Sequence, residues 1–393
     1  MKNIFTYFIL IISLIFGVVF YDLISVAGFT YIDELISALL LMECLRRKKF
    51  KREFCAFFFI VLLFLFSSLA THINTTPAII TDFFIIIKPF IAFYSVYFMG
   101  LQLTNSQKKT IRRIIMIMVY IIIFGVIIDY ELFVWTIPSH ASRFATMIVV
   151  FAFTYYYCSE RDRRSLIYTL LILSISLLSL RSKAFGFFTI AFFLLYFLRT
   201  KTFSLSIANL ISAIIVIALV ILVSWEKISF YFIEGTDRDN VENFMARPAL
   251  YVGAYKILCD YPIMGSGMGT YASFASSEYY SPLYNQYNLD RVHGLEEGGS
   301  FISDTFFPAL AQYGIAGIFF FFYFFYMRYK EIVYNKRNTG NLQWFKMTSL
   351  FLIFFFIESI SDSTLVQNRG VVMMMLLAMY IIDGRKKIEI VKV

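Results

Sequence analysis

The chain has 393 residues, of which 60% are hydrophobic and 16% charged, with a formal net charge of +9 and a mean hydropathy of +0.73. A soluble domain is about 45–50% apolar and about 25% charged, so the composition excludes an ordinary soluble domain and indicates a polytopic membrane protein. The positive charge does not indicate nucleic-acid binding, because most of the 35 Lys and Arg residues fall in short loops or tails on one predicted side of a membrane.

Apolar stretches long enough, or nearly long enough, to cross a bilayer recur along the chain; a crossing takes about 20 residues. They lie at 4–22, 26–45, 54–71, 78–101, 114–134, 144–158, 166–181, 183–199, 205–224, 301–327, 347–365 and 370–383. We therefore predict an all-α, polytopic integral membrane protein with about 12 transmembrane helices. The first stretch lacks a convincing cleavage site and is predicted to be an uncleaved span. The pair 166–181 and 183–199 is also compatible with one long tilted element.

Basic loops fall at every second junction between these stretches. They occupy 46–52, 108–113, 161–164, 199–201, 328–337 and 385–387. Under the positive-inside rule these loops are cytoplasmic, which places both termini in the cytoplasm and residues 225–300 outside. Three regions follow: N-terminal transmembrane helices (1–224), a large extracytoplasmic loop (225–300), and C-terminal transmembrane helices with a basic cytoplasmic tail (301–393).

The long loop is the only extended polar stretch, and long loops are usually functional. Pro248 suits the first turn of a helix, so we expect short helices here. Arg247 then lies at a helix N-terminus, where free N–H groups favour a bound anion. The run Gly265-x-Gly267-x-Gly269 follows a turn and not a strand, so it does not match a dinucleotide-binding fingerprint. We expect its glycines to allow tight turns close to a ligand or another helix.

Several cations lie on the predicted outer side, against the positive-inside rule: Arg143, Arg181, Lys183 and Arg247. Arginine makes planar, bidentate contacts with phosphate oxygens, and lysine adds a point charge. Such a cluster at the outer leaflet suits a lipid-linked pyrophosphate. The alternative is that these long side chains only extend to the membrane interface.

Carboxylates also lie near the outer side. Asp304 follows the long loop, and a buried carboxylate can act as a base; the alternative is that it only pairs with an arginine. Glu358, Asp362 and Arg369 are further charges that could line the same cavity. The four cysteines and three histidines show no metal-binding spacing, so we predict no metal and no cofactor.

Four stretches resemble the superfamily of O-antigen ligases and Wzy-type O-antigen polymerases. They are Ser142-Arg143-Phe144; Leu180-Arg-Ser-Lys-Ala184; Arg247-x-x-x-Tyr251 with the later Pro262-x-x-Gly265-x-Gly267-x-Gly269-x-Tyr271; and Ser303-Asp304-Thr-Phe-Phe307 with Leu310 to Gly317. The resemblance implies a GT-C-like glycosyltransferase. Polymerases of the family transfer a growing glycan from undecaprenyl pyrophosphate to a lipid-linked repeat unit, and ligases transfer it to lipid A-core. Ligases usually carry a histidine near the position of Asp304, and this departure favours a polymerase.

From the resemblance we expect Arg143, Arg247 and Asp304 to be catalytic. The residues expected to bind substrate are Arg181, Lys183, Tyr251, Tyr271, Arg291 and His293. The arginines would hold the donor pyrophosphate, Asp304 would orient or deprotonate the acceptor hydroxyl, and the two tyrosines would stack on sugar rings.

The expected partners are an undecaprenyl-pyrophosphate-linked oligosaccharide, the lipid bilayer and, as a candidate, a polysaccharide chain-length regulator, with no nucleic acid. The expected location is the bacterial cytoplasmic membrane. Two alternatives remain at this stage: an O-antigen ligase, and a lipid-linked sugar flippase or transporter. A transporter of this size usually has two matched halves, which the sequence does not show.

Overall fold

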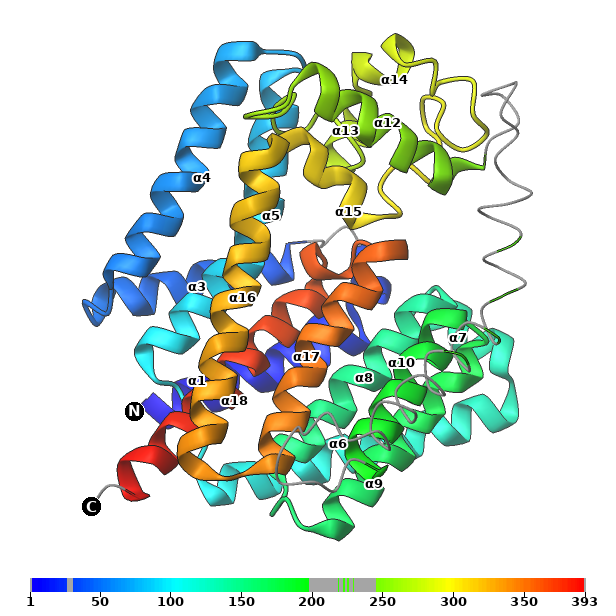
Figure 1. Ribbon diagram of the computed structural model, residues 1–393. Helices are drawn as coiled ribbons and strands as arrows, with labels where there is room; N and C mark the ends of the chain where they lie inside the picture. Colours follow the sequence, from blue (N-terminus) through cyan, green and yellow to red (C-terminus); the bar gives the residue numbers. More distant parts are fainter. Residues whose placement is uncertain are drawn as a thin grey trace.

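The computed structural model describes residues 2–26, 31–197 and 245–391, together with single residues at 218, 222, 225 and 229. Within these residues the fold is all helical (Figure 1). The predicted span 205–224, the end of 183–199 and the first part of the predicted loop (225–244) lie outside the described residues, apart from those single positions.

The first half of the described chain forms a series of helices joined by short turns. They are α1 (Lys2–Leu14), η1 (Ile15–Val19), α2 (Tyr21–Val26), α3 (Ile32–Arg46), α4 (Arg52–Thr71), α5 (Thr76–Met99), α6 (Asn105–Ile128), α7 (Tyr130–Thr136), α8 (Ala141–Cys158), α9 (Arg163–Ile175), η2 (Ser176–Ser179), α10 (Ser182–Phe192) and η3 (Phe193–Phe197). The stretch 166–197 is two elements and not one, because the backbone turns at Leu180 with a left-handed φ of 52°.

The second half begins with the loop helices and ends in three long helices. The elements are α12 (Ala246–Asp260), α13 (Phe274–Glu278), α14 (Pro282–Gln286), α15 (Phe306–Ala309), η6 (Leu310–Tyr313), α16 (Gly314–Thr339), α17 (Leu342–Ser361), η7 (Thr364–Val366) and α18 (Asn368–Val391). Short helices inside the predicted loop are therefore present.

Five helical stretches in the described residues are long and apolar enough to cross a membrane. They are Arg52–Thr71, Thr76–Met99, Asn105–Ile128, Phe306–Thr339 and Leu342–Ser361, and two shorter apolar stretches are Ile4–Val19 and Ser182–Leu195. The protein is thus a polytopic helical membrane protein, while the count of about 12 spans stays a prediction.

Helix-capping residues change the bounds of one predicted span. The stretch 114–134 is helical from Asn105, because Thr104 and Gln107 form a capping box at that end. This helix stops at Asp129, whose side chain accepts from the Leu132 N–H and begins α7. The long apolar helix of this stretch is therefore α6, and α7 is a separate short helix that follows its end.

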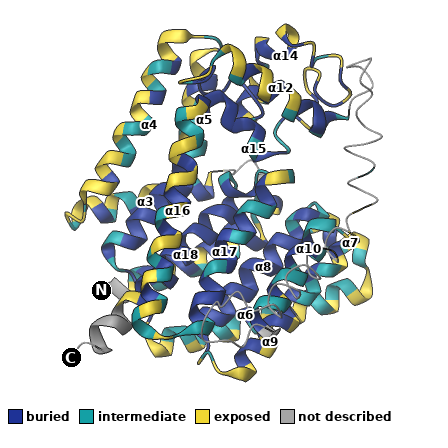
Figure 2. Cartoon of the chain, viewed as in Figure 1, coloured by how far each residue is buried: buried dark blue, intermediate teal, exposed yellow. Residues whose placement is uncertain are grey.

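Burial separates central helices from peripheral ones (Figure 2). α8 is buried along almost its whole length, and α18 is buried from Asn368 to Ile382. A helix that is hydrophobic all round needs such a central place. By contrast α4 and α6 bury few of their side chains, as expected for helices that face lipid. α18 packs against both α8 and α17.

The loop region packs around a small core of its own, at the top of Figure 1. Buried Asp82 on α5 attaches it to the bundle: its Oδ2 accepts from the Gly269 N–H at 3.1 Å, the Gln312 amide at 2.9 Å and the Tyr313 hydroxyl at 2.9 Å. A Cβ at Gly265 would lie 2.3 Å from the Gln312 carbonyl oxygen. The expectation that the glycines allow close approach to another helix is confirmed.

Candidate functional site

One buried carboxylate holds two arginines from distant parts of the chain. Asp22, in the short helix α2, is 3% exposed. Its Oδ1 lies 2.6 Å from Nη1 of Arg143 in the first turn of α8, and its Oδ2 lies 2.6 Å from Nη2 of Arg369 at the start of α18. Arg369 is almost fully buried, whereas the Arg143 side chain is 43% exposed. Asp22 therefore fixes Arg143 while leaving part of its side chain accessible.

Lys183 is held between two carboxylates on α17 and the turn that follows it. α10 begins at Ser182, directly after the left-handed turn, and this places the Lys183 Nζ 2.7 Å from Glu358 Oε2 and 2.6 Å from Asp362 Oδ2. The Ser142 hydroxyl donates to the same Asp362 oxygen at 2.5 Å. Lys183 is therefore neutralised and links α10 to α17, and Asp362 joins this pair to Ser142 on α8.

Arg181 differs from the other cations of the cluster. Its guanidinium Nη2 lies 3.0 Å from Nε2 of His140, and among the described residues no ion pair joins it to a carboxylate. The other ring nitrogen, Nδ1, accepts from the Ser142 backbone N–H at 3.2 Å, so that His140 caps α8. Burial, then the charges of Arg181 and Arg143, lower the pKa of His140. His140 is therefore neutral at neutral pH.

The loop brings a further arginine and carboxylate to this end of the bundle. Arg247 is in the first turn of α12 and pairs with Asp304, whose Oδ2 lies 3.0 Å from its Nε. The Tyr251 hydroxyl donates to the carbonyl oxygen of Ile360 at 2.8 Å, which joins α12 to the end of α17. Burial raises the pKa of Tyr251 to about 12, so its hydroxyl keeps its proton.

Side-chain contacts bring the predicted residues to one end of the bundle. His140 contacts Arg181, and Ser142 and Lys183 both bind Asp362. The Tyr251 bond to Ile360 joins α12, with its Arg247–Asp304 pair, to the end of α17. Arg143, Arg181, Lys183, Arg247, Tyr251 and Asp304 thus gather at the ends of α8, α10, α12 and α17. A cluster of fixed cations beside carboxylates is suited to binding a polyanion and orienting a hydroxyl group.

Three predicted residues are placed differently. Tyr271 is fully buried; its hydroxyl donates to the Leu250 carbonyl oxygen at 2.7 Å and its ring stacks on Tyr284. It offers no face to a sugar, so the structure does not support a stacking role. The His293 side chain is 95% exposed, and Glu296 Oε1 lies 4.0 Å from it. Arg291 is exposed in the same loop.

Asp22, His140 and Ser142 also belong to this site, although no role was predicted for them from the sequence. His140 and Ser142 stand next to Arg143 just before a span, and that position was the available signal. Asp22 gave no such signal, because its partners lie 121 and 347 residues away.

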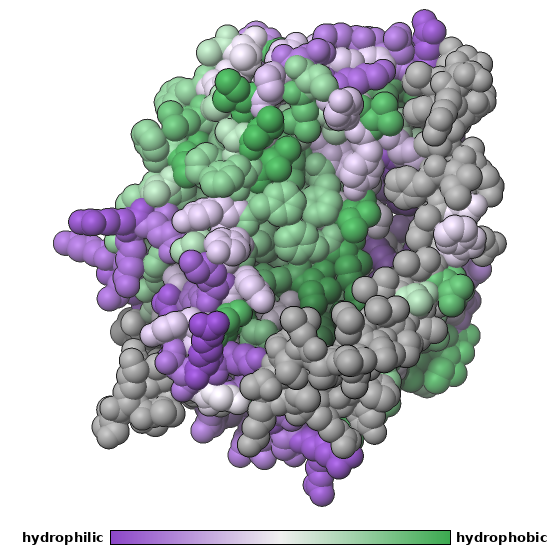
Figure 3. All heavy atoms as spheres, in the orientation of Figure 1, coloured by the Kyte–Doolittle hydropathy of each residue, from purple (hydrophilic) through white to green (hydrophobic). Residues whose placement is uncertain are grey.

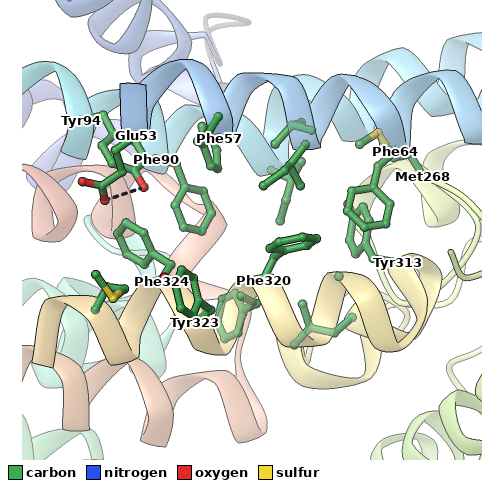
Figure 4. Close-up of a pocket in the computed structure, with 18 residues that line it drawn as sticks. Glu53, Phe57, Phe64, Phe90, Tyr94, Met268, Tyr313, Phe320, Tyr323 and Phe324 are labelled. Carbon is green, nitrogen blue, oxygen red and sulfur yellow. Dashed lines mark hydrogen bonds between the residues drawn. The ribbon is translucent and has the colours of Figure 1, made fainter. Parts of the chain in front are cut away.

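A second feature is an apolar groove between α4, α5 and α16, lined largely by Phe and Tyr side chains (Figure 4). Its one charged lining residue, Glu53, pairs with Arg328. Figure 3 shows hydrophobic residues forming a broad band on the visible face. Three membrane-length helices line the groove, and none of the predicted site residues is among its lining residues.

The fold and the site define a polytopic, all-helical membrane protein with an arginine-rich site at one end of its bundle. Residues 166–322 match the family model described as O-antigen ligase. This match is consistent with the superfamily of O-antigen ligases and Wzy-type polymerases, a class of membrane glycosyl-transfer enzymes. The matched region includes Arg181, Lys183, Arg247 and Asp304. No curated protein sequence is similar enough to the chain to count as a match.

Proposed function

We propose that the protein is a polysaccharide polymerase. It transfers a growing glycan from undecaprenyl pyrophosphate to a lipid-linked repeat unit, at the outer face of the bacterial cytoplasmic membrane, with both termini in the cytoplasm. The observation that carries the proposal is the gathering of Arg143, Arg181 and Arg247 beside Asp304 in a chain whose residues 166–322 match the O-antigen ligase family model.

The proposed reaction depends mainly on the leaving group. The acceptor hydroxyl oxygen forms a bond to the anomeric carbon of the donor sugar, and the bond from that carbon to the pyrophosphate oxygen breaks. The negative charge that develops on the pyrophosphate is stabilised by Arg143, Arg181 and Arg247, which are held in place before the substrate arrives. Lys183 acts indirectly, because it is bound to Glu358 and Asp362.

Asp304 orients the acceptor hydroxyl and accepts its proton as the new bond forms. Its side chain is 32% exposed, so an incoming hydroxyl can reach it. The residue also favours a polymerase over a ligase, since the ligases of the family usually carry a histidine near this position. A ligase remains the alternative, and loss of a ligase leaves finished polymer on the lipid carrier, whereas loss of a polymerase leaves single repeats.

The test is polymer length in cells that carry Arg247→Ala or Arg143→Ala. We expect the ladder of long-chain polysaccharide on gels to collapse to single repeats in both. The matched control is Lys256→Ala, which removes an exposed cation from the same helix as Arg247 and should leave the ladder unchanged. Normal long-chain polymer in both arginine variants would refute the arginine site. Flipping by purified protein in liposomes without any glycosyl transfer would favour a transporter.

A further inference from the structure

The two ring nitrogens of His140 both face hydrogen-bond donors. Nδ1 lies 3.2 Å from the Ser142 backbone nitrogen, and Nε2 lies 3.0 Å from a guanidinium nitrogen of Arg181. A neutral imidazole has one acceptor nitrogen and one N–H, and a guanidinium has no acceptor at all. One of the two contacts therefore brings a donor against a donor.

The backbone contact is the one that the fold fixes. The Ser142 N–H belongs to the first turn of α8, where the helix offers it no acceptor, and His140 supplies one from the N-cap position. Nδ1 is therefore the acceptor and Nε2 carries the proton. The N–H of Nε2 then points at Arg181, which has no ion pair to a carboxylate in the described part of the chain.

We propose that Arg181 and His140 form a two-donor site for one anionic oxygen of a diphosphate. The inference rests on the proposed function, because it names the part of the donor that this pair binds. An oxygen about 2.8 Å from each nitrogen satisfies both donors. No proton is transferred: His140 donates a hydrogen bond to the leaving group as its charge develops.

The neighbourhood of His140 agrees with this role. Arg143 on α8 and Arg181 before α10 favour the neutral imidazole, while Asp362 after α17 and Asp304 in the loop oppose them. The Trp135 ring lies edge-on to the imidazole, with centroids 6.3 Å apart.

Two substitutions at position 140 distinguish the role of Nε2 as a hydrogen-bond donor from the role of Nδ1 as the cap of α8. His140→Asn keeps a side-chain acceptor for the Ser142 N–H, since Asn is a good N-cap residue, but it is too short to place a donor at the Nε2 position. His140→Gln places an amide N–H near that position. The matched control is His72→Asn: His72 is exposed at the end of α4 with a φ of 47°, a conformation that Asn accepts.

The experiment measures the affinity of the purified full-length protein in nanodiscs for inorganic pyrophosphate and for a polyprenyl diphosphate. We expect His140→Asn to weaken binding of both probes by about tenfold to a hundredfold, His140→Gln to retain more affinity, and His72→Asn to match the wild type. Unchanged affinity in His140→Asn would overturn the proposal. So would a loss confined to the lipid probe, because the site would then contact a different part of the carrier.

A second measurement does not depend on the folding of the variants at position 140. In a His72→Gln, His293→Gln background, ¹⁵N NMR of the remaining imidazole should show a neutral ring protonated on Nε2, both free and with pyrophosphate. A ring protonated on Nδ1 would contradict the assignment. Normal polymer in the Arg143 and Arg247 variants would end the glycan-transfer proposal, yet a loss of pyrophosphate affinity at His140→Asn would still stand.

Discussion

Arg143 on α8 donates to Asp22 on α2, with Nη1 2.6 Å from Oδ1, across 121 residues of sequence. The other oxygen of the same carboxylate binds Arg369. One acidic side chain therefore sets the position of an arginine proposed to touch the substrate and neutralises a second arginine that is 1% exposed. The site depends on the packing of the first, middle and last parts of the chain.

The first prediction concerns this shared carboxylate. Asp22→Asn removes the charge that compensates buried Arg369, and breaking a buried ion pair from one side typically costs about 3–5 kcal/mol. We expect a large drop in the thermal stability of the purified protein, followed by size-exclusion chromatography after heating. The control is Arg46→Gln, which breaks the Arg46–Glu43 pair at a side chain that is 63% exposed, while Glu43 keeps its pair with Arg47, and it should change stability little. Equal stabilities for the two variants would show that Asp22 is not a structural anchor.

The second prediction compares two glycines of the loop, both in the left-handed region. Gly265 has a φ of +76° and backbone atoms of residues 312–314 within 2.4 Å of where a Cβ would lie; Gly298 has a φ of +79° and open space around it. Alanine adds backbone strain at either position, about 1 kcal/mol, but only Gly265→Ala also forces the loop away from η6. We expect Gly265→Ala to abolish polymer formation and Gly298→Ala to leave it largely intact, as measured on gels. Similar effects would mean that strain, and not close packing, explains the glycine.

Part of this architecture could be predicted from local sequence. The lengths of the apolar stretches predicted the helices α4, α5, α16 and α17. Composition could not decide whether 166–181 and 183–199 form one element, and the turn at Leu180 in the structure separates them. Cations on the predicted outer side, against the positive-inside rule, indicated the site. The partners of those cations could not be predicted, because the pairing of Asp22 with Arg369 arises only when α2 packs against α18.

The burial of aromatic residues in the loop could not be predicted from local sequence either. Tyr251 and Tyr271 both follow polar motifs in the loop, and local sequence offers no way to tell them apart. The packing of the loop does: the Tyr251 ring lies on the side of α12 that meets α17, whereas the Tyr271 ring is enclosed with Tyr284 in the core of the loop. Burial of this kind is a tertiary property.

The third prediction separates a structural ion pair from a catalytic one. Arg247→Asp and Asp304→Arg are each expected to lower polymer formation by about a hundredfold or more, since each removes a group proposed to act on the substrate. The double variant restores an ion pair between the loop helix and the chain before α15. We expect it to recover thermal stability relative to either single variant without recovering polymer. Recovery of polymer by the double variant would show that the pair only docks α12.

The last prediction follows from the lowered pKa of His140. Below the ordinary pKa of about 6.5, the imidazole of His140 is protonated in the unfolded chain but is protonated less readily in the folded protein. The unfolded state therefore binds more protons as the pH falls. The stability contributed by neutral His140 is therefore present above about pH 6.5 and is lost progressively as the pH is lowered. We expect the melting temperature of the purified protein to fall between about pH 7 and pH 5. His140→Asn, which caps α8 without titrating, should flatten that part of the profile, while His72→Asn should not. An identical pH profile for wild type and His140→Asn would mean that the imidazole is as easily protonated in the folded protein as in water.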